Sequence, residues 1–93
     1  MPSRIGLFRR KVILGLYELT SHAKEEMEQD GFTIRDVKSA VYSGRIAGTQ
    51  RHGRGRRKHV VSGRAEDRRR LRLIVRLTDS GRLRIITVFA EQR

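Results

Sequence analysis

Residues 70–89 read R-L-R-L-I-V-R-L-T-D-S-G-R-L-R-I-I-T-V-F, and this stretch decides the fold of the chain. Apolar and polar side chains alternate on both sides of Asp79-Ser80-Gly81. That pattern is typical of two β-strands joined by a three-residue turn with glycine in the left-handed position. The turn pairs Arg76 with Arg84 and so predicts the register of a β-hairpin.

This register predicts a sheet with two different faces. The core face collects Leu71, Leu73, Val75, Leu77, Leu83, Ile85, Thr87 and Phe89. The opposite face collects Arg70, Arg72, Ile74, Arg76, Arg82, Arg84, Ile86 and Val88. Because a slip of one residue would mix the two sets, the segregation favours this register, and we expect helices to cover the apolar face.

The remaining sequence extends the sheet on one side and supplies the helices on the other. Period-two alternation predicts strands at 45–51, 58–64, 70–78 and 82–90, joined by short loops in an antiparallel meander. Helical spacing and capping signals predict helices at 3–14, 21–29 and 33–44, with an extended link at 16–19. We therefore expect an α+β fold in which N-terminal helices pack on one face of a four-stranded antiparallel sheet.

The length of 93 residues predicts a single domain over 1–93, with 1–44 mainly helical and 45–93 forming the sheet. Whether the first helix docks on this sheet or on a second copy stays open, and so does a homodimer. No apolar run is long enough to span a membrane and no signal peptide is recognisable, which predicts a cytoplasmic protein.

The charge is large and uneven. Twenty-two Lys and Arg against ten Asp and Glu give a net charge of +12. Residues 45–76 carry twelve basic and two acidic side chains, whereas residues 15–44 carry three basic and six acidic ones. A basic half of this density favours a polyanionic partner such as RNA, although a solvated face is the simpler alternative.

Two groups of basic residues are candidates for contact with nucleic acid. The sheet face offers Arg70, Arg72 and Arg84. The loop R-H-G-R-G-R-R-K-H at 51–59 adds Arg54, Arg56, Arg57 and Lys58 and suits a phosphate clamp. His52 and His59 flank that loop, but without cysteine or a third ligand they make a poor metal site, so we expect neither a metal nor a cofactor.

His22 is a candidate catalytic residue. Metal-independent RNA cleavage needs a group that moves protons and cations that hold the phosphate. An imidazole titrates near neutral pH, so His22 with Arg64 and Arg76 could supply both. A histidine in the first turn of a helix is, however, more often a packed or hydrogen-bonded side chain.

The stretch from Leu19 to Gly44, the strand V-V-S-G-R and the closing I-I-T-V-F resemble a bacterial family of unknown function with a Thr-x-His-Ala signature. The motif positions are Thr20, His22, Ala23, Met27, Gly31, Val37, Gly44, Gly63, Arg64, Thr87 and Val88. The resemblance implies an architecture like that of the RelE, BrnT and MqsR toxin ribonucleases, and an antitoxin partner of the zinc-finger MqsA type.

Three positions depart from the family pattern. Glu26 and Asp30 stand where the family commonly has arginine, and Phe32 stands where it has isoleucine. Two cations near His22 are thus replaced by acids, so any cationic role in cleavage would fall to the sheet, above all to Arg64 and Arg76.

Three functions follow as hypotheses. The leading one is a toxin-like RNA-binding protein that cleaves mRNA without metal, as part of a type II toxin–antitoxin pair. The second is a nucleic-acid-binding module without turnover. The third is a basic interaction protein that receives an acidic or zinc-finger antitoxin.

Overall fold

The computed structural model describes residues 3–52 and 56–91. Its elements follow in the order α1 (Arg4–Ile13), β1 (Tyr17–Leu19), α2 (Ser21–Asp30), α3 (Ile34–Ser43), β2 (Arg45–His52), β3 (Arg56–Arg64), β4 (Arg70–Leu77) and β5 (Leu83–Ala90). The α+β class and the positions of the predicted helices and strands are confirmed, with ends that differ by one or two residues. No helix in this part of the chain is long and apolar enough to span a membrane.

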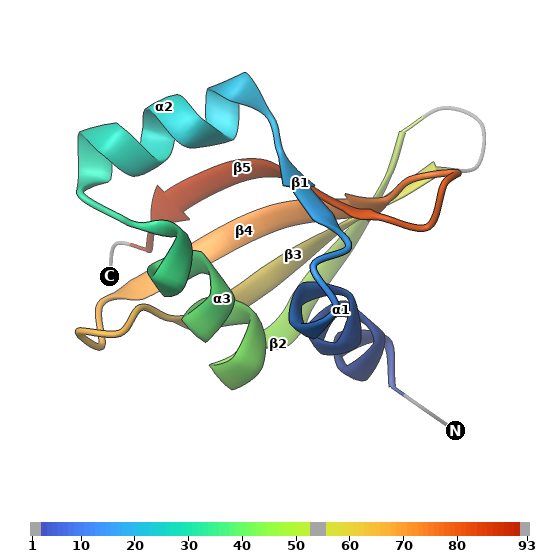
Figure 1. Cartoon of the computed structure of the whole chain (residues 1–93), viewed down its shortest axis with the longest axis horizontal. Helices are drawn as coiled ribbons and strands as arrows, with labels where there is room; N and C mark the ends of the chain where they lie inside the picture. The colour runs from blue at the N-terminus through green and yellow to red at the C-terminus, as the bar shows by residue number, and fades with distance from the viewer. Residues whose placement is uncertain (1–2, 53–55, 92–93) are drawn as a thin grey trace.

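The sheet has five strands in the order β1-β5-β4-β3-β2 (Figure 1). Strands β2 to β5 form the antiparallel meander that the sequence predicts. The prediction of a purely antiparallel, four-stranded sheet is wrong, because Tyr17–Leu19 pairs parallel with Leu83–Ile85 as an edge strand. Three residues are too few to display a period of two, so this strand reads in the sequence as an extended link.

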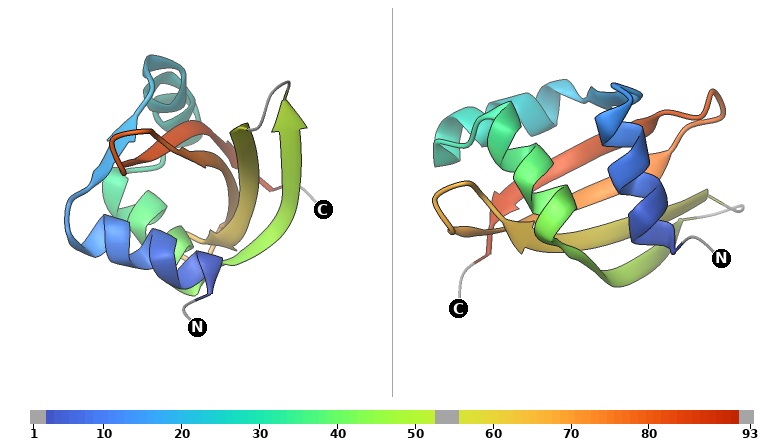
Figure 2. Two further views of the ribbon diagram at one scale, coloured as in Figure 1. Left: turned by 90° about the vertical axis from the view of Figure 1, so that its right-hand side faces the viewer. Right: turned by 60° about the horizontal axis from the view of Figure 1, so that its bottom comes forward.

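The helices pack against one face of a curved sheet and leave the other face without helices (Figure 2). Helix α1 docks on this sheet, with Phe8 and Val12 buried in the common core. The same core contains Ala23 and Met27 of α2, Val37, Ala40 and Val41 of α3, and core-facing side chains of β3, β4 and β5. The helix ends follow the capping signals, most clearly the reciprocal capping box of Thr33 and Asp36.

The β4–β5 hairpin has the predicted turn and, near the turn, the predicted register. Gly81 adopts a φ of +84°, and Arg76 lies opposite Arg84. Beyond Val75 and Ile85 the register shifts, so that Ile74 lies opposite Thr87. This β-bulge inserts one extra residue and reverses the alternation in the rest of β5.

The predicted faces are therefore wrong at the end of β5. Val88 is fully buried in the core, whereas Thr87 and Phe89 lie on the opposite face and are half-buried. The bulge coincides with the end of β1 pairing, where the Thr20 amide donates to the Ile85 carbonyl and the Thr20 hydroxyl to the Ile86 carbonyl. The bulge thus lies where the chain leaves β1 and enters α2, a tertiary contact that the alternation of the sequence does not indicate.

The end of α3 approaches β3 so closely that two positions exclude a side chain. A Cβ at Gly63 would overlap the carbonyl group of Ala40, and one at Gly44 would overlap the same oxygen and lie 2.8 Å from the Ser62 carbonyl oxygen. Each contact is with backbone, which cannot swing aside. The two motif glycines therefore fix how α3 lies on the sheet.

We expect Gly63→Ala to lower the free energy of unfolding by about 3 kcal/mol or more, because helix and strand must separate to admit the methyl group. Gly48→Ala is the matched control, since a Cβ there meets nothing within 4 Å. Chemical denaturation of both variants measures the difference. Equal stability of the two variants would show that the approach is not as close as described.

Candidate nucleic-acid interface

The helix-free face has basic residues at both ends and apolar residues between them. Register and burial place Val60 and Ile74 in its middle, half-buried. The basic side chains at one end are Arg45, Arg64, Arg70 and Arg72, and those at the other are Lys58, Arg76 and Arg84. The alternating arginines that the sequence predicts on one face are thus divided into two groups.

Several of these arginines already have carboxylate partners within the chain. Arg84 Nε lies 2.9 Å from Glu18 Oε2, on the neighbouring β1 strand. Arg72 Nη2 lies 2.8 Å from Glu91 Oε1, while Arg70 Nη1 lies 3.8 Å from Glu91 Oε2. The charge of Arg72 and Arg84 is therefore largely matched inside the fold, and that of Arg70 only loosely.

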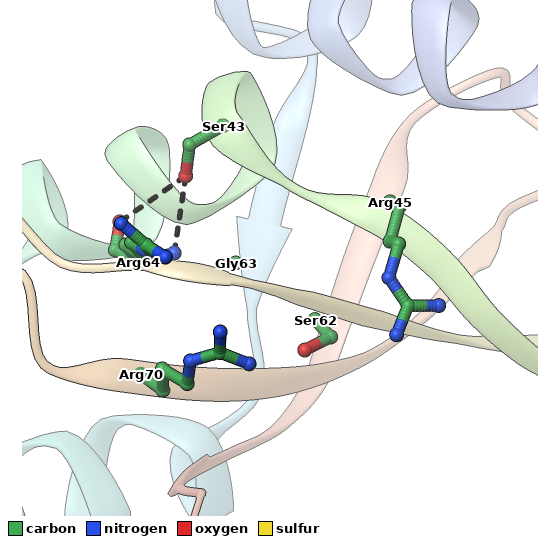
Figure 3. Close-up of a pocket in the computed structure, with 6 residues that line it drawn as sticks. All are labelled: Ser43, Arg45, Ser62, Gly63, Arg64 and Arg70. Carbon is green, nitrogen blue, oxygen red and sulfur yellow. Dashed lines mark hydrogen bonds between the residues drawn. The ribbon is translucent and has the colours of Figure 1, made fainter.

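Three arginines from three strands converge at one end of the face, around a cavity of about 300 Å³ that we call the basic basin (Figure 3). The residues that line it are Ser43, Arg45, Ser62, Gly63, Arg64 and Arg70. In Figure 3 the guanidinium groups of Arg45 and Arg70 reach toward β3 from its two sides. No carboxylate is among the lining residues, but Glu91 Oε2 borders the basin and lies 3.4 Å from Ser62 Oγ and 3.8 Å from Arg70 Nη1.

Local hydrogen bonds hold the backbone of the basic basin. The Ser43 hydroxyl accepts from the Arg64 amide at 3.0 Å and donates to the Ser39 carbonyl at 2.9 Å (Figure 3). Ser43 thereby joins the last turn of α3 to the end of β3. Among the residues that the structure describes, the guanidinium groups of Arg45 and Arg64 have no carboxylate partner, so both stay available to an anion.

The other predicted contact residues lie elsewhere. Arg76 is on the helix-free face at the opposite end, and its Nε is buried without a hydrogen-bond partner in the described structure. Arg57 is exposed and Lys58 is half-buried at the start of β3. Arg54 and the side chain of Arg56 lie outside the described residues.

His22 does not line the basic basin. It begins α2, its side chain is 64% exposed, and its Nε2 lies 3.3 Å from Glu26 Oε1, one helical turn away. In the described structure it makes no contact with Arg64 or Arg76, and the assignment of these three residues to one catalytic centre stays a prediction. Thr20, the N-cap of α2, and Gly31, its left-handed C-cap, hold the helix ends.

Glu26 and Asp30 act on the edge of the sheet. Strand β1 covers β5 only as far as Ile85, which leaves later amide groups of β5 without a strand partner. Glu26 Oε1 accepts from the Val88 amide at 3.0 Å, and Asp30 Oδ2 accepts from the Ala90 amide at 3.4 Å. The two acids thus take the place of a neighbouring strand, which explains them in structural terms.

We expect Glu26→Ala to destabilise the fold by about 1–3 kcal/mol, because it leaves the part-buried Val88 amide without an acceptor. Glu26→Gln keeps an acceptor oxygen and should recover most of the loss. Glu25→Ala removes the same charge from an exposed position and serves as control. If Glu25→Ala were as damaging in thermal unfolding, charge and not the hydrogen bond would be responsible.

His59 is a core residue. Its side chain is buried in β3, its ring centroid lies 5.5 Å from that of Phe8, and its Nδ1 lies 3.1 Å from Thr49 Oγ1. Burial lowers the pKa of His59 below its ordinary value, and the positive charges of Arg4 and Arg57 lower it further. The imidazole is therefore kept neutral and serves packing.

This depressed pKa predicts that stability falls as the pH drops below about 6.5, where the unfolded chain takes up a proton on His59 and the folded chain does not. Thermal unfolding between pH 7.5 and pH 5 measures the slope. His59→Gln should flatten it. An unchanged slope in His59→Gln would contradict the neutral imidazole.

No group of three histidine, aspartate or glutamate side chains that could hold a metal ion is found within 3–52 and 56–91. Sequence reasoning missed Arg45, Ser43 and Ser62 as lining residues of the basic basin. Arg45 sits one residue after a helix, where alternation has only begun, and the two serines carry no charge. Gly44 and Gly63, selected as motif positions, were the signal that could have located the basin.

A comparison at the family level matches residues 19–90 to Domain of unknown function (DUF4258), and the chain belongs to that family. Searches among curated proteins and among solved structures found no significant match. The predicted membership in a family of unknown function is confirmed. The likeness to toxin ribonucleases stays a prediction.

Proposed function

We propose that this DUF4258 domain is a toxin-like RNA-binding protein whose basic basin holds a phosphate group of the RNA backbone. The observation that supports it most is the convergence of Arg45, Arg64 and Arg70 on one cavity with no carboxylate in its lining. Like charges that line one cavity repel one another, and a bound phosphate would relieve the repulsion.

The surroundings of the basin support the same proposal. Ser43 and Ser62 line it as small polar side chains that leave room beside the arginines, while the Ser43 hydroxyl donates to the Ser39 carbonyl and the Ser62 hydroxyl to Glu91 Oε2. A cavity of about 300 Å³ has ample room for a phosphate group. The net charge of +12 would add long-range attraction for a polyanion.

We expect Arg64→Ala to weaken binding of a short single-stranded RNA about tenfold and to reduce the salt slope by about one. The contacts of Ser43 are with the backbone of Arg64, so the variant should fold normally. Arg10→Ala, on the exposed side of α1, is the control of equal charge. Fluorescence anisotropy at several salt concentrations measures both quantities, and salt-independent binding would contradict the proposal.

Cleavage of the bound RNA is the second candidate function. It draws on His22, whose exposed imidazole has a carboxylate partner at 3.3 Å. Because His22 does not line the basic basin, binding without turnover is the function that the geometry supports better.

Incubation of RNA with the protein in EDTA tests the cleavage candidate. Under that candidate the wild type cuts the RNA, and His22→Ala and Arg76→Ala do not. Cutting that survives both substitutions removes the predicted catalytic set. No cutting at any protein concentration leaves binding as the function.

An antitoxin partner, acidic or of the zinc-finger type, is part of the same proposal. Contact with some protein is supported by the exposed apolar pair Ile13 and Leu14 at the end of α1, with 70% and 59% of their surface accessible. The acidic or zinc-finger character of the partner comes from the family resemblance alone. Such a pair next to a helix end suits contact with another protein. This surface is separate from the basic basin, so a partner there would leave the phosphate site open.

A further inference from the structure

The turn between β3 and β4 contains a residue in an unfavourable backbone conformation. Ala65 and Arg69 close a three-residue turn, with the Ala65 amide donating to the Arg69 carbonyl at 2.8 Å and the Arg68 amide to the Ala65 carbonyl at 3.0 Å. Arg68 has a φ of +74°, and no other non-glycine residue within 3–52 and 56–91 has a positive φ. An L-residue adopts this left-handed region only at a cost in free energy.

The chain contains a second turn of the same kind for comparison. Between β4 and β5 the Thr78 amide donates to the Arg82 carbonyl at 2.8 Å, and the Gly81 amide donates to the Thr78 carbonyl at 3.0 Å. The left-handed position there is Gly81, with a φ of +84°. The two turns match bond for bond, so glycine is the residue that this geometry favours at Arg68.

The surroundings hold the turn but make no use of the Arg68 side chain. Asp36 is buried, and its Oδ1 accepts from the Glu66 amide at 3.0 Å. Arg69 donates to the carbonyl groups of Asp30 and Gly31 at 2.8 and 3.1 Å, and its guanidinium lies 4.3 Å from the ring centre of Phe32. Arg68 itself is exposed and has no hydrogen-bond or ion-pair partner in the described part of the chain.

No contact of the Arg68 side chain inside the described structure therefore offsets the strain of its backbone. Its side chain instead lines a cavity of about 410 Å³, together with Arg64, Arg69, Arg70 and Glu91. Arg64 and Arg70 also line the basic basin, so the two cavities adjoin. Together they form a basic path that continues from the basin to the tip of the β3–β4 hairpin.

We propose that Arg68 binds a second phosphate, next to the one in the basic basin, so that the site takes a nucleic-acid backbone with consecutive phosphates. This inference rests on the proposed function and adds a residue and a ligand class to it. Arg69 is engaged with α2 and the turn, and Glu91 partly neutralises Arg70. Arg64 also lines the basic basin and is assigned to the phosphate there, so Arg68 is the cation of this cavity that is left for a second phosphate.

The test uses Arg68→Gly and Arg68→Lys in the full chain. Arg68→Gly should raise Tm by roughly 4–8 °C, because glycine adopts the left-handed conformation without strain. It should also weaken binding of a single-stranded RNA about tenfold and lower the salt slope by about one, while leaving the affinity for a nucleoside monophosphate unchanged. Arg68→Lys keeps strain and charge, so its Tm and salt slope should stay those of the wild type.

Three results would overturn the inference. Arg68→Gly with wild-type RNA affinity, alongside a weakened Arg64→Ala, would reject the second phosphate and leave the proposed function standing. Arg68→Gly with a Tm at or below that of the wild type would remove the argument from strain. Full RNA affinity in both Arg64→Ala and Arg68→Gly would reject the proposed function as well.

Discussion

The contact between the Ala40 carbonyl group and Gly63 is the constraint on which the rest of the structure depends. A side chain at Gly63 or Gly44 would push α3 away from β3. With the two backbones in contact, the last turn of α3 brings the Ser43 hydroxyl to the Arg64 amide. The chain then enters β2 so that Arg45 lies beside Ser62 of β3, two residues before Arg64, whose partner on β4 is Arg70. Close backbone packing on the core side thereby sets the positions of cations on the opposite side.

The acidic side chains within residues 15–44 and the basic side chains within residues 45–76 have different roles. Glu26 and Asp30 depart from the arginines expected at these positions, and both accept from amides of β5 that β1 leaves uncovered. A helix carries carboxylates at i and i+4 on one face, so α2 can cover a strand edge in this way. His22, one turn before Glu26, shares the same carboxylate oxygen as Val88. His22 therefore belongs to the covered edge of the sheet, and it does not line the basic basin.

The sequence predicted most of the sheet, because hydrophobic alternation and glycine turns are local signals. Strands β2 to β5, the Arg76–Arg84 register and the turn at Gly81 needed no tertiary information. Two features of the sheet could not be predicted from the sequence, for physical reasons. Strand β1 is too short to show a period of two. The bulge after Ile85 coincides with the contacts of Thr20 with β5, which join residues far apart in the sequence. The site was predicted only in part. Arg64 and Arg70 were selected from the sequence, whereas Arg45, the first residue of a predicted strand, and Arg68, in the loop between two predicted strands, are placed beside them only by the fold.

The proposed function rests on Arg45, Arg64 and Arg70, which line one cavity. If RNA binds there, its contacts must fall on the basic basin. The most direct test of RNA binding at the basin is to map changes in backbone amide chemical shifts by NMR during titration with a short single-stranded RNA. We expect chemical-shift changes at Ser62, Gly63, Arg64 and Arg70, with little change in α1 and in the first turns of α2. Shifts confined to α1 or α2, with these four residues unchanged, would contradict it.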